Sequence, residues 1–390
     1  MNTPASVLIV GASAAGLSTA ESLRRQGYRG RLTLLGGEPH LPYDRPPLSK
    51  QVLSGQWAPE RAQLRPPAAL SDLDADFVLG DPAVGLDAAT HTVRTASGNT
   101  LQAEAIVLAT GVRPRTLPES AELAGVHVLR TLDDTLALQL DLLRSKRLVV
   151  MGEGVLGAEI AATARTLGLD VTMVGPQPAP MFSQLGPMVS GLLADVHTEH
   201  GVHLRLGTGV TGLTGRRGRV AGVRLDTGEE LPADVVVVAI GGIPNTDWLA
   251  GSGLALDNGV VCDSRCRAAE GIYAVGDVAR WPHRDVLLRL ENRTNATEQA
   301  AVAAANILGA DQPYTPIPHF WTDQFDTKIQ VHGTLPADAD VTIVDGDVAN
   351  RRFVARHSVA GRAVGFVGWN MPKQTRLRRQ EIVDLQLANH

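Results

Sequence analysis

The chain has 390 residues, a length typical of roughly two or three domains, and its 44% hydrophobic and 20% charged content is that of a globular protein. A formal net charge of −5 gives no reason to expect nucleic acid or an acidic membrane surface as a partner. Two cysteines cannot form a disulfide framework, no segment is apolar for long enough to span a bilayer, and the N-terminus lacks the basic and apolar regions of a signal peptide. We therefore expect a cytoplasmic protein without a membrane partner.

The first predicted element is a buried strand over residues 7–10, which runs into a glycine-rich turn and a helix in "VLIVGASAAGLSTA" (7–20). Gly11 permits the tight turn, and Gly16 lets helix and strand pack closely. Ser13 stands where a second glycine would let a pyrophosphate approach. Because phosphates bind the free N–H groups at a helix start, the candidate binding residues are Gly11, Ser13, Ala14, Ala15 and Gly16.

A second unit of the same kind begins at "VVMGEGVLGAEIAA" (149–162), and each unit continues into another apolar strand, at 31–37 and at 170–176. Its candidate binding residues are Gly152, Gly154, Val155, Leu156 and Gly157. Farther along, "VRTASGNTLQAEAIVLATG" (93–111) aligns without a gap on "VRLDTGEELPADVVVVAIG" (223–241). Two glycine turns, each closed by the same hairpin and strand, predict two bound dinucleotides.

Four stretches then resemble one family: "EPHLPYDRPPLSK" (38–50), "LATGVRPR" (108–115), "VLRTLDD" (128–134) and "IYAVGDVA" (272–279). From about residue 6 to 332 the chain is similar to the FAD-dependent ferredoxin reductases that serve dioxygenases and haem monooxygenases. The resemblance implies an α/β fold with two Rossmann-like dinucleotide-binding domains (three-layer, glutathione-reductase-like) and a small α+β C-terminal domain. The expected domains are FAD-binding, 1–115 with 245–312; NAD(P)-binding, 116–244; and C-terminal, 313–390.

The resemblance also implies roles for residues outside the glycine turns. It places Lys50 beside the reacting edge of the flavin, Glu159 near the nicotinamide carboxamide, and Trp321 at the exposed flavin edge, where electrons would leave. Glu38 has the spacing of an acid that accepts from the adenosine ribose of FAD. The remaining expected cofactor contacts are Arg45, Thr110, Gly111, Arg130, Gly241, Asp277 and Glu291.

The implied activity is hydride transfer from NADH or NADPH to FAD, followed by single-electron transfer to a two-iron, two-sulfur ferredoxin that feeds an oxygenase. The protein would be a monomer or a homodimer, with no metal site. Two alternatives stay open: an NAD(P)H oxidase that reduces oxygen directly, and a flavin-binding scaffold subunit with a weakened nicotinamide site. Basic residues at Arg351, Arg352, Arg376, Arg378 and Arg379 are candidates for docking an acidic ferredoxin.

Three positions depart from the family pattern. Gly175 stands where NAD-specific enzymes usually have a strand-end acid, and Ser183 stands where the family often has an arginine. We therefore expect weakly anchored adenosine and affinities for NADH and NADPH within about tenfold of each other. Arg293 replaces a family tryptophan and would put a cation near the flavin or face solvent. Cys262 and Cys266 are expected to be ordinary thiols, which argues against a disulfide reductase.

Overall fold

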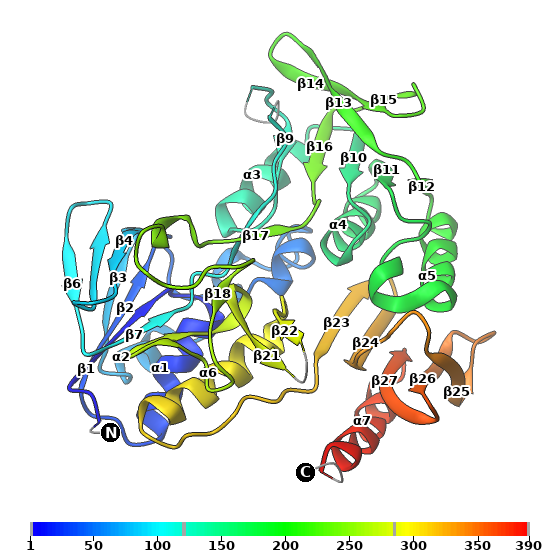
Figure 1. Cartoon of the computed structure of the whole chain (residues 1–390). Coiled ribbons are helices and arrows are strands. Elements are labelled where there is room, and N and C mark those ends of the chain that lie inside the picture. The colour runs from blue at the N-terminus through cyan, green and yellow to red at the C-terminus, as the bar shows by residue number, and fades with distance from the viewer. Residues whose placement is uncertain (1–2, 119–121, 284–285, 388–390) are drawn as a thin grey trace. The chain divides into compact units, whose positions relative to one another are not determined.

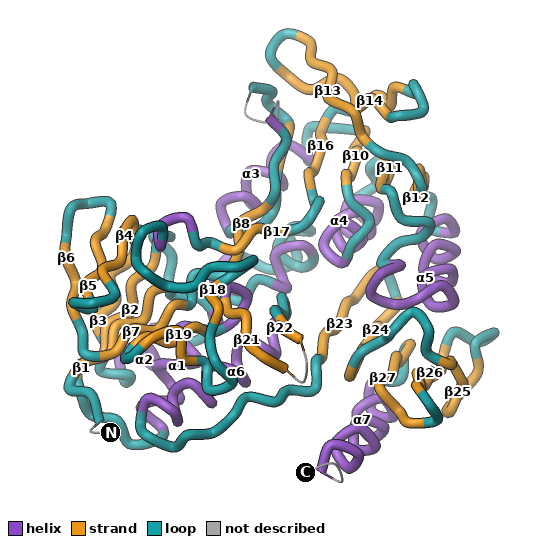
Figure 2. The backbone as a smooth tube through the Cα atoms, viewed as in Figure 1, coloured by secondary structure: helices purple, strands orange, loops and turns teal. Residues whose placement is uncertain are grey.

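The computed structural model describes residues 3–118, 122–283 and 286–387 (Figures 1 and 2). The chain forms two compact units. The first comprises Met1–Asp44, Gln63–Arg113 and Ile243–Pro316, and the second comprises Arg45–Ala62, Pro114–Gly242 and Ile317–His390. Among the described residues no helix is long and apolar enough to cross a membrane.

The first unit is built on a six-stranded sheet in the order β19-β20-β7-β1-β2-β3, parallel except for β19. Its strands are β1 (Ser6–Val10), β2 (Arg31–Gly36), β3 (Asp76–Leu79), β7 (Ala105–Leu108), β19 (Arg267–Ala269) and β20 (Ile272–Ala274). All four residues of β7 are buried, as expected for a parallel strand covered on both faces. Helix α1 (Ala14–Arg25) packs against α6 (Arg293–Ile307). Smaller elements are α2 (Pro67–Ser71), β4 (Ala83–Asp87), β5 (Thr92–Thr95), β6 (Thr100–Gln102), β18 (Val260–Val261), β21 (Ala279–His283) and β22 (Val286–Leu288).

The second unit repeats this arrangement with a five-stranded parallel sheet in the order β12-β11-β10-β16-β9. Its strands are β9 (Val126–His127), β10 (Arg147–Met151), β11 (Asp170–Gly175), β12 (Val202–Leu206) and β16 (Val235–Val238). The helices are α3 (Leu132–Leu142), α4 (Val155–Thr166) and α5 (Phe182–Glu199), and a separate antiparallel sheet contains β13 (Val210–Arg216), β14 (Arg219–Leu225) and β15 (Glu230–Pro232). Two short crossover strands, β8 (Val112–Pro114) and β17 (Gly242–Pro244), pair with each other.

The internal repeat predicted from the sequence is present in the backbone. Strands β5, β6 and β7 of the first unit correspond to β14, β15 and β16 of the second, as the gapless alignment requires. In each copy an antiparallel pair leads into a fully buried parallel strand that lies beside the first strand of its unit. The α/β fold with two Rossmann-like halves is therefore confirmed.

The C-terminal part of the second unit is an antiparallel sheet in the order β23-β24-β27-β26-β25, with α7 (Pro372–Leu387) packed on β24 and β27. The strands are β23 (His319–Gln324), β24 (Thr327–Gly333), β25 (Asp340–Asp347), β26 (Arg352–Val359) and β27 (Arg362–Trp369). This α+β part agrees with the sequence prediction.

The segment Arg45–Ala62 differs from the expected domain assignment, which placed it in the FAD-binding domain. It packs with the second unit instead. Hydrogen bonds explain this: Gln139 of α3 donates to the carbonyls of Val52 and Leu53 at 3.0 and 3.2 Å, and Thr163 of α4 donates to the carbonyl of Ser49 at 2.7 Å. Lys50 consequently belongs structurally to the second unit.

Candidate functional site

The first glycine turn has the geometry of a phosphate cradle. Gly11 has φ +123°, and a Cβ on it would lie 2.2 Å from the carbonyl oxygen of Ala109. A Cβ on Gly16 would lie 1.8 Å from the carbonyl oxygen of Gly11, so neither position tolerates a side chain. Ser13 precedes α1 in an extended conformation, and no side-chain hydrogen bond caps the helix. The first-turn N–H groups thus remain available to an anion.

Other predicted residues of the first unit gather at the carboxyl ends of the same parallel strands. Glu38 follows β2 and accepts a hydrogen bond from the Tyr43 hydroxyl. Asp277 follows β20, beside Gly276, where a Cβ would lie 2.9 Å from the Cβ of Ala15 in the first turn. Ligands of open α/β sheets bind at this edge, so the residues present suit a dinucleotide.

Thr110 and Gly111 follow β7 and are tied to the return crossover. The Thr110 hydroxyl donates to the carbonyl of Asn245 at 3.0 Å, and the Asn245 side-chain amide donates back to the Thr110 carbonyl at 2.9 Å. The Asn245 backbone N–H also donates to the carbonyl of Gly111 at 2.9 Å. Asn245 therefore holds this strand end in place, a role that no sequence motif signalled.

The cation at Arg293 is neutralised. Its Nε lies 2.6 Å from Oδ1 of Asp44, and the two side chains are only 24% and 31% exposed. Its position at the start of α6 thus ties that helix to the segment after β2. Arg293 therefore does not simply face solvent, and its placement near the flavin stays a prediction. Glu291 is likewise paired, 2.6 Å from Nη1 of Arg289.

The second glycine turn reproduces the first. Gly152 has φ +111°, with Ala239 O 2.2 Å from the place of a Cβ, and a Cβ on Gly157 would lie 1.9 Å from the carbonyl oxygen of Gly152. Gly154 precedes α4, again without a side-chain cap, so Val155 and Leu156 present first-turn N–H groups. Gly241 follows the end of β16 and is exposed. These residues suit a second dinucleotide.

A carboxylate lies at the end of β11, although Gly175 itself has no side chain. It belongs to Glu153, inside the glycine motif, rather than to residue 175. The Glu153 side chain is 7% exposed, and Oε1 accepts a hydrogen bond from the backbone N–H of Gln177 at 3.1 Å. Ser183, on α5, donates to Oε1 of Gln177 at 3.4 Å and so lies close to the residue that binds the Glu153 carboxylate.

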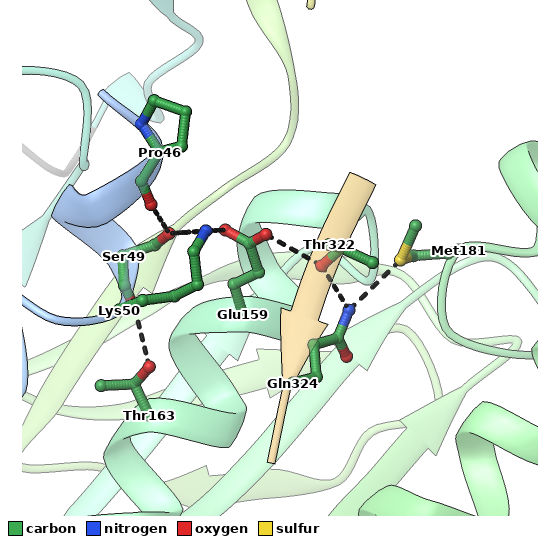
Figure 3. A network of polar contacts seen from close by, with 8 residues as sticks. All are labelled: Pro46, Ser49, Lys50, Glu159, Thr163, Met181, Thr322 and Gln324. Carbon is green, nitrogen blue, oxygen red and sulfur yellow. Dashed lines mark hydrogen bonds and ion pairs between the residues drawn. The ribbon is translucent and has the colours of Figure 1, made fainter. Parts of the chain in front are cut away.

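Lys50 and Glu159 form a buried ion pair (Figure 3). The Lys50 Nζ lies 2.7 Å from Oε2 of Glu159, with the side chains 11% and 7% exposed. Ser49 donates to the same oxygen at 2.5 Å, and Thr322 of β23 donates to Oε1 at 2.8 Å. Gln324 extends the network by donating to Thr322 at 3.0 Å. The carboxylate thus joins three segments: the 3₁₀ helix 46–49, α4 and β23.

Arg45 and Arg130 are also brought together, since the Arg45 guanidinium donates to the Arg130 carbonyl. The Arg130 backbone N–H donates to Oδ2 of Asp134 at 3.0 Å, next to the capping box that Thr131 and Asp134 form at the start of α3. This cap fixes the backbone of Arg130.

Trp321 lies half-buried on β23, with the ring of His319 stacked 5.9 Å from it and His332 stacked 4.2 Å beyond His319. Burial, together with the neighbouring His319 and Arg379, lowers the pKa of His332 to about 3, so this ring is neutral. The three rings form an aromatic row in which the histidines carry no charge at neutral pH.

The proposed basic docking residues are only partly available. Arg351 makes a two-point contact with Glu199, both N–O distances being 2.6 Å, and Arg378 pairs with Asp345 and Glu381 at 2.8 and 2.9 Å. Arg352 and Arg376 are exposed.

Both cysteines are buried free thiols, as expected, and burial raises the pKa of Cys266 to about 12.

Residues 5–305 match the sequence profile of the pyridine nucleotide-disulphide oxidoreductases, and residues 319–386 match the reductase C-terminal profile. The chain belongs to the pyridine nucleotide-disulphide oxidoreductase family. Rhodocoxin reductase of Rhodococcus erythropolis is 40% identical over 372 residues, which cover 94% of this chain and 87% of that protein. Putidaredoxin reductase of Pseudomonas putida is 33% identical over 98% of this chain and 93% of its own length.

Solved structures place this member within the family. A ferredoxin reductase from Rhodopseudomonas palustris superposes with a TM-score of 0.90 at 37% identity, covering 95% of this chain and 91% of that one. The reductase of a covalent putidaredoxin reductase–putidaredoxin complex superposes with a TM-score of 0.92 at 32% identity, covering 97% and 93%. This pyridine nucleotide-disulphide oxidoreductase therefore has the glutathione-reductase-like fold and is an enzyme of the ferredoxin reductase type.

Sequence reasoning missed Glu153, Asp44, Ser49, Thr322 and Asn245, which complete the polar networks around the predicted residues. Glu153 carried one readable signal, an acidic residue between the first two glycines of the motif. The others are ordinary polar residues whose partners are distant in the chain.

Proposed function

We propose that the chain is an NAD(P)H-dependent ferredoxin reductase that serves an oxygenase, with FAD held by the first unit and NAD(P)H by the second. The observation that carries the proposal is the pair of glycine cradles, one in each unit, in which the glycines of the tight turn and of the helix–strand contact are present and only the middle glycine of the first cradle is replaced, by Ser13. The relatives named above are reductases of electron carriers, which supports the same conclusion.

In the first unit, we assign the turn from Gly11 to Gly16 to the FAD pyrophosphate, Glu38 to its adenosine ribose and Asp277 to the chain that carries the flavin. Their places at the carboxyl ends of β1, β2 and β20 support these roles. Thr110, Gly111 and Glu291 would lie along the same cofactor. Bound FAD would supply the conversion between two-electron hydride chemistry and single-electron transfer.

In the second unit, the turn from Gly152 to Gly157 would bind the nucleotide pyrophosphate, with Gly241 at the neighbouring strand end. Lys50 and Glu159 would then position the nicotinamide. Glu159 accepts three hydrogen bonds, which hold its carboxylate in one orientation, and the ion pair keeps the Lys50 ammonium at a defined place. Such pre-organisation favours a near-attack geometry, and hydride transfer needs no proton donor from the protein.

For the partner, we propose a two-iron, two-sulfur ferredoxin that receives electrons near Trp321. One support is that a solved relative is a covalent reductase–carrier complex. Arg352 and Arg376 are the better docking candidates, since Arg351 and Arg378 are bound to acids of this chain. The scaffold alternative rested on Gly175 and Ser183, and the position of the Glu153 carboxylate at the end of β11 argues against it.

The decisive experiment mixes the FAD-loaded protein anaerobically with NADH or NADPH and follows flavin bleaching, then adds an oxidised two-iron, two-sulfur ferredoxin. We expect prompt bleaching, followed by reoxidation that accelerates with ferredoxin concentration. Aerobic turnover that consumes oxygen equally fast without ferredoxin would favour the oxidase instead. Bleaching by dithionite but by neither nucleotide would overturn the reductase function.

A further inference from the structure

The carboxylate of Glu153 occupies the place of a side chain at residue 175. An ideal Cβ built on Gly175, the last residue of β11, would lie 1.6 Å from Oε2 and 2.3 Å from Cδ of Glu153. The φ angle of Gly175 is outside the left-handed region, so the backbone does not require glycine there. Gly175 lacks a side chain because Glu153 fills that space.

The Glu153 carboxylate is held firmly in this place. Oε1 of Glu153 accepts a hydrogen bond from the backbone N–H of Gln177 at 3.1 Å. The backbone carbonyl of Glu153 accepts another from the N–H of Met181 at 2.7 Å. The loop after β11 is therefore wrapped around Glu153. Oε2 has no hydrogen-bond partner within the part of the chain that the structure describes, and it remains available to a donor from a ligand.

We propose that Glu153 is the nucleotide-specificity residue of this enzyme: its carboxylate accepts a hydrogen bond from the adenosine ribose of NADH and disfavours the 2′-phosphate of NADPH. The inference rests on the proposed binding of the nucleotide to the second unit. In Rossmann domains the ribose hydroxyls lie at the end of the second strand, where an acidic residue accepts from them. Here the acid reaches that place from the glycine turn of the neighbouring strand β10.

Charge explains the selectivity. A 2′-phosphate carries about −1.5 to −2 charges, and it would meet a buried carboxylate instead of a cation. Residues 175–187, from the end of β11 into α5, and residues 207–210, after β12, contain no lysine or arginine. Arg205, which pairs in register with Val174, is already bound to Glu229 at 3.2 Å.

This inference reverses the expectation of similar affinities drawn from Gly175 and Ser183. We expect kcat/KM for NADH to exceed that for NADPH by at least about a hundredfold. The preference should reside in binding, so NAD⁺ should bind more tightly than NADP⁺ by a similar factor in titration calorimetry of the FAD-loaded full-length protein.

The test variant is Glu153→Gln, whose side chain keeps the volume and can still accept from the Gln177 N–H while losing the charge. We expect the NADH to NADPH ratio to fall by at least about tenfold, mainly through tighter NADP⁺ binding. The matched control is Glu230→Gln, which removes an equal charge from an exposed strand of the same unit and should leave the ratio unchanged. Ferricyanide serves as electron acceptor, so the assay is independent of ferredoxin.

A second variant keeps the test decisive if the first disturbs the loop. Glu153→Ala should lose selectivity, and Glu153→Ala combined with Gly175→Glu should regain NADH preference, because the acid then stands on the strand itself. Equal binding of NAD⁺ and NADP⁺ by the wild type, or an unchanged ratio in Glu153→Gln, would overturn the inference while leaving the reductase function intact. Failure of both nucleotides to bind would overturn both.

Discussion

The ion pair between Lys50 and Glu159 should show strong energetic coupling in a double-mutant cycle. Replacing Glu159 by leucine leaves the Lys50 ammonium, 11% exposed, without its counter-charge. Removal of one partner of a buried pair costs about 3–5 kcal/mol. Replacing Lys50 by methionine should cost less, about 2–3 kcal/mol, because Ser49 and Thr322 still donate to the carboxylate.

The double variant Lys50→Met with Glu159→Leu removes both charges and should cost well below the sum of the single changes, with a coupling of at least about 2 kcal/mol. The assay is equilibrium urea unfolding of the FAD-loaded protein, followed by tryptophan fluorescence at one FAD concentration, because a bound ligand adds stability by mass action. If the loss of unfolding free energy in the double variant equals the sum of the two single losses to within about 0.5 kcal/mol, the two charges do not stabilise each other and the reasoning is refuted.

The same pair makes a kinetic prediction with Glu159→Gln, whose single amide oxygen retains an acceptor for either Ser49 or Thr322 but loses the charge. Since misplacing a positioning group by about 1 Å can cost about a hundredfold, we expect the rate of flavin bleaching by NADH to fall by about tenfold to a hundredfold. A normal rate at saturating NADH would show that the pair is purely structural.

Three shorter predictions concern stability and reactivity. Gly152→Ala should abolish nucleotide binding or folding, because its Cβ would overlap the Ala239 carbonyl at 2.2 Å, and NADH titration with circular dichroism distinguishes the two losses. Burial lowers the pKa of His197 in the folded protein to about 4 from its ordinary value of 6.5. As the pH falls from 6.5 towards 4, the histidine therefore takes up a proton in the unfolded state but not in the folded state. Stability should be complete above pH 6.5 and fall by about 2 kcal/mol by pH 5, and His197→Asn should flatten this slope in unfolding experiments. Cys262 and Cys266 are buried and have raised pKa values, so a thiol reagent should label neither in the native protein and both after denaturation; rapid native labelling would contradict their burial.

The sequence predicted those features that depend on backbone geometry. Gly11 and Gly152 must be glycine because each has a positive φ and lies against the carbonyl of the next parallel strand. A fixed residue type at a fixed spacing is readable without any structure. The repeated hairpin was readable for the same reason, since turn residues and a buried apolar run determine it locally.

The sequence could not predict which side chain compensates for an unusual residue. The salt bridge of Arg293 was not readable from the sequence because its partner, Asp44, lies 249 residues away in the chain. Gly175 looked like a missing acid because nothing local shows that Glu153 reaches across from the adjacent strand. In both cases a departure from the family pattern was visible, and its structural consequence depended on tertiary contacts.

The two glycine cradles differ in where the acidic side chain beside the second strand comes from. In both we expect backbone N–H groups of the glycine turn to hold the pyrophosphate, whereas the adenosine ribose would meet one acidic side chain in each. In the first unit we assign this role to Glu38, which follows β2; in the second, Glu153 reaches the corresponding end of β11 from the preceding turn. Nucleotide preference can therefore change at residues 153 and 175 while the sheet, the glycine turn and the Lys50–Glu159 pair stay as they are.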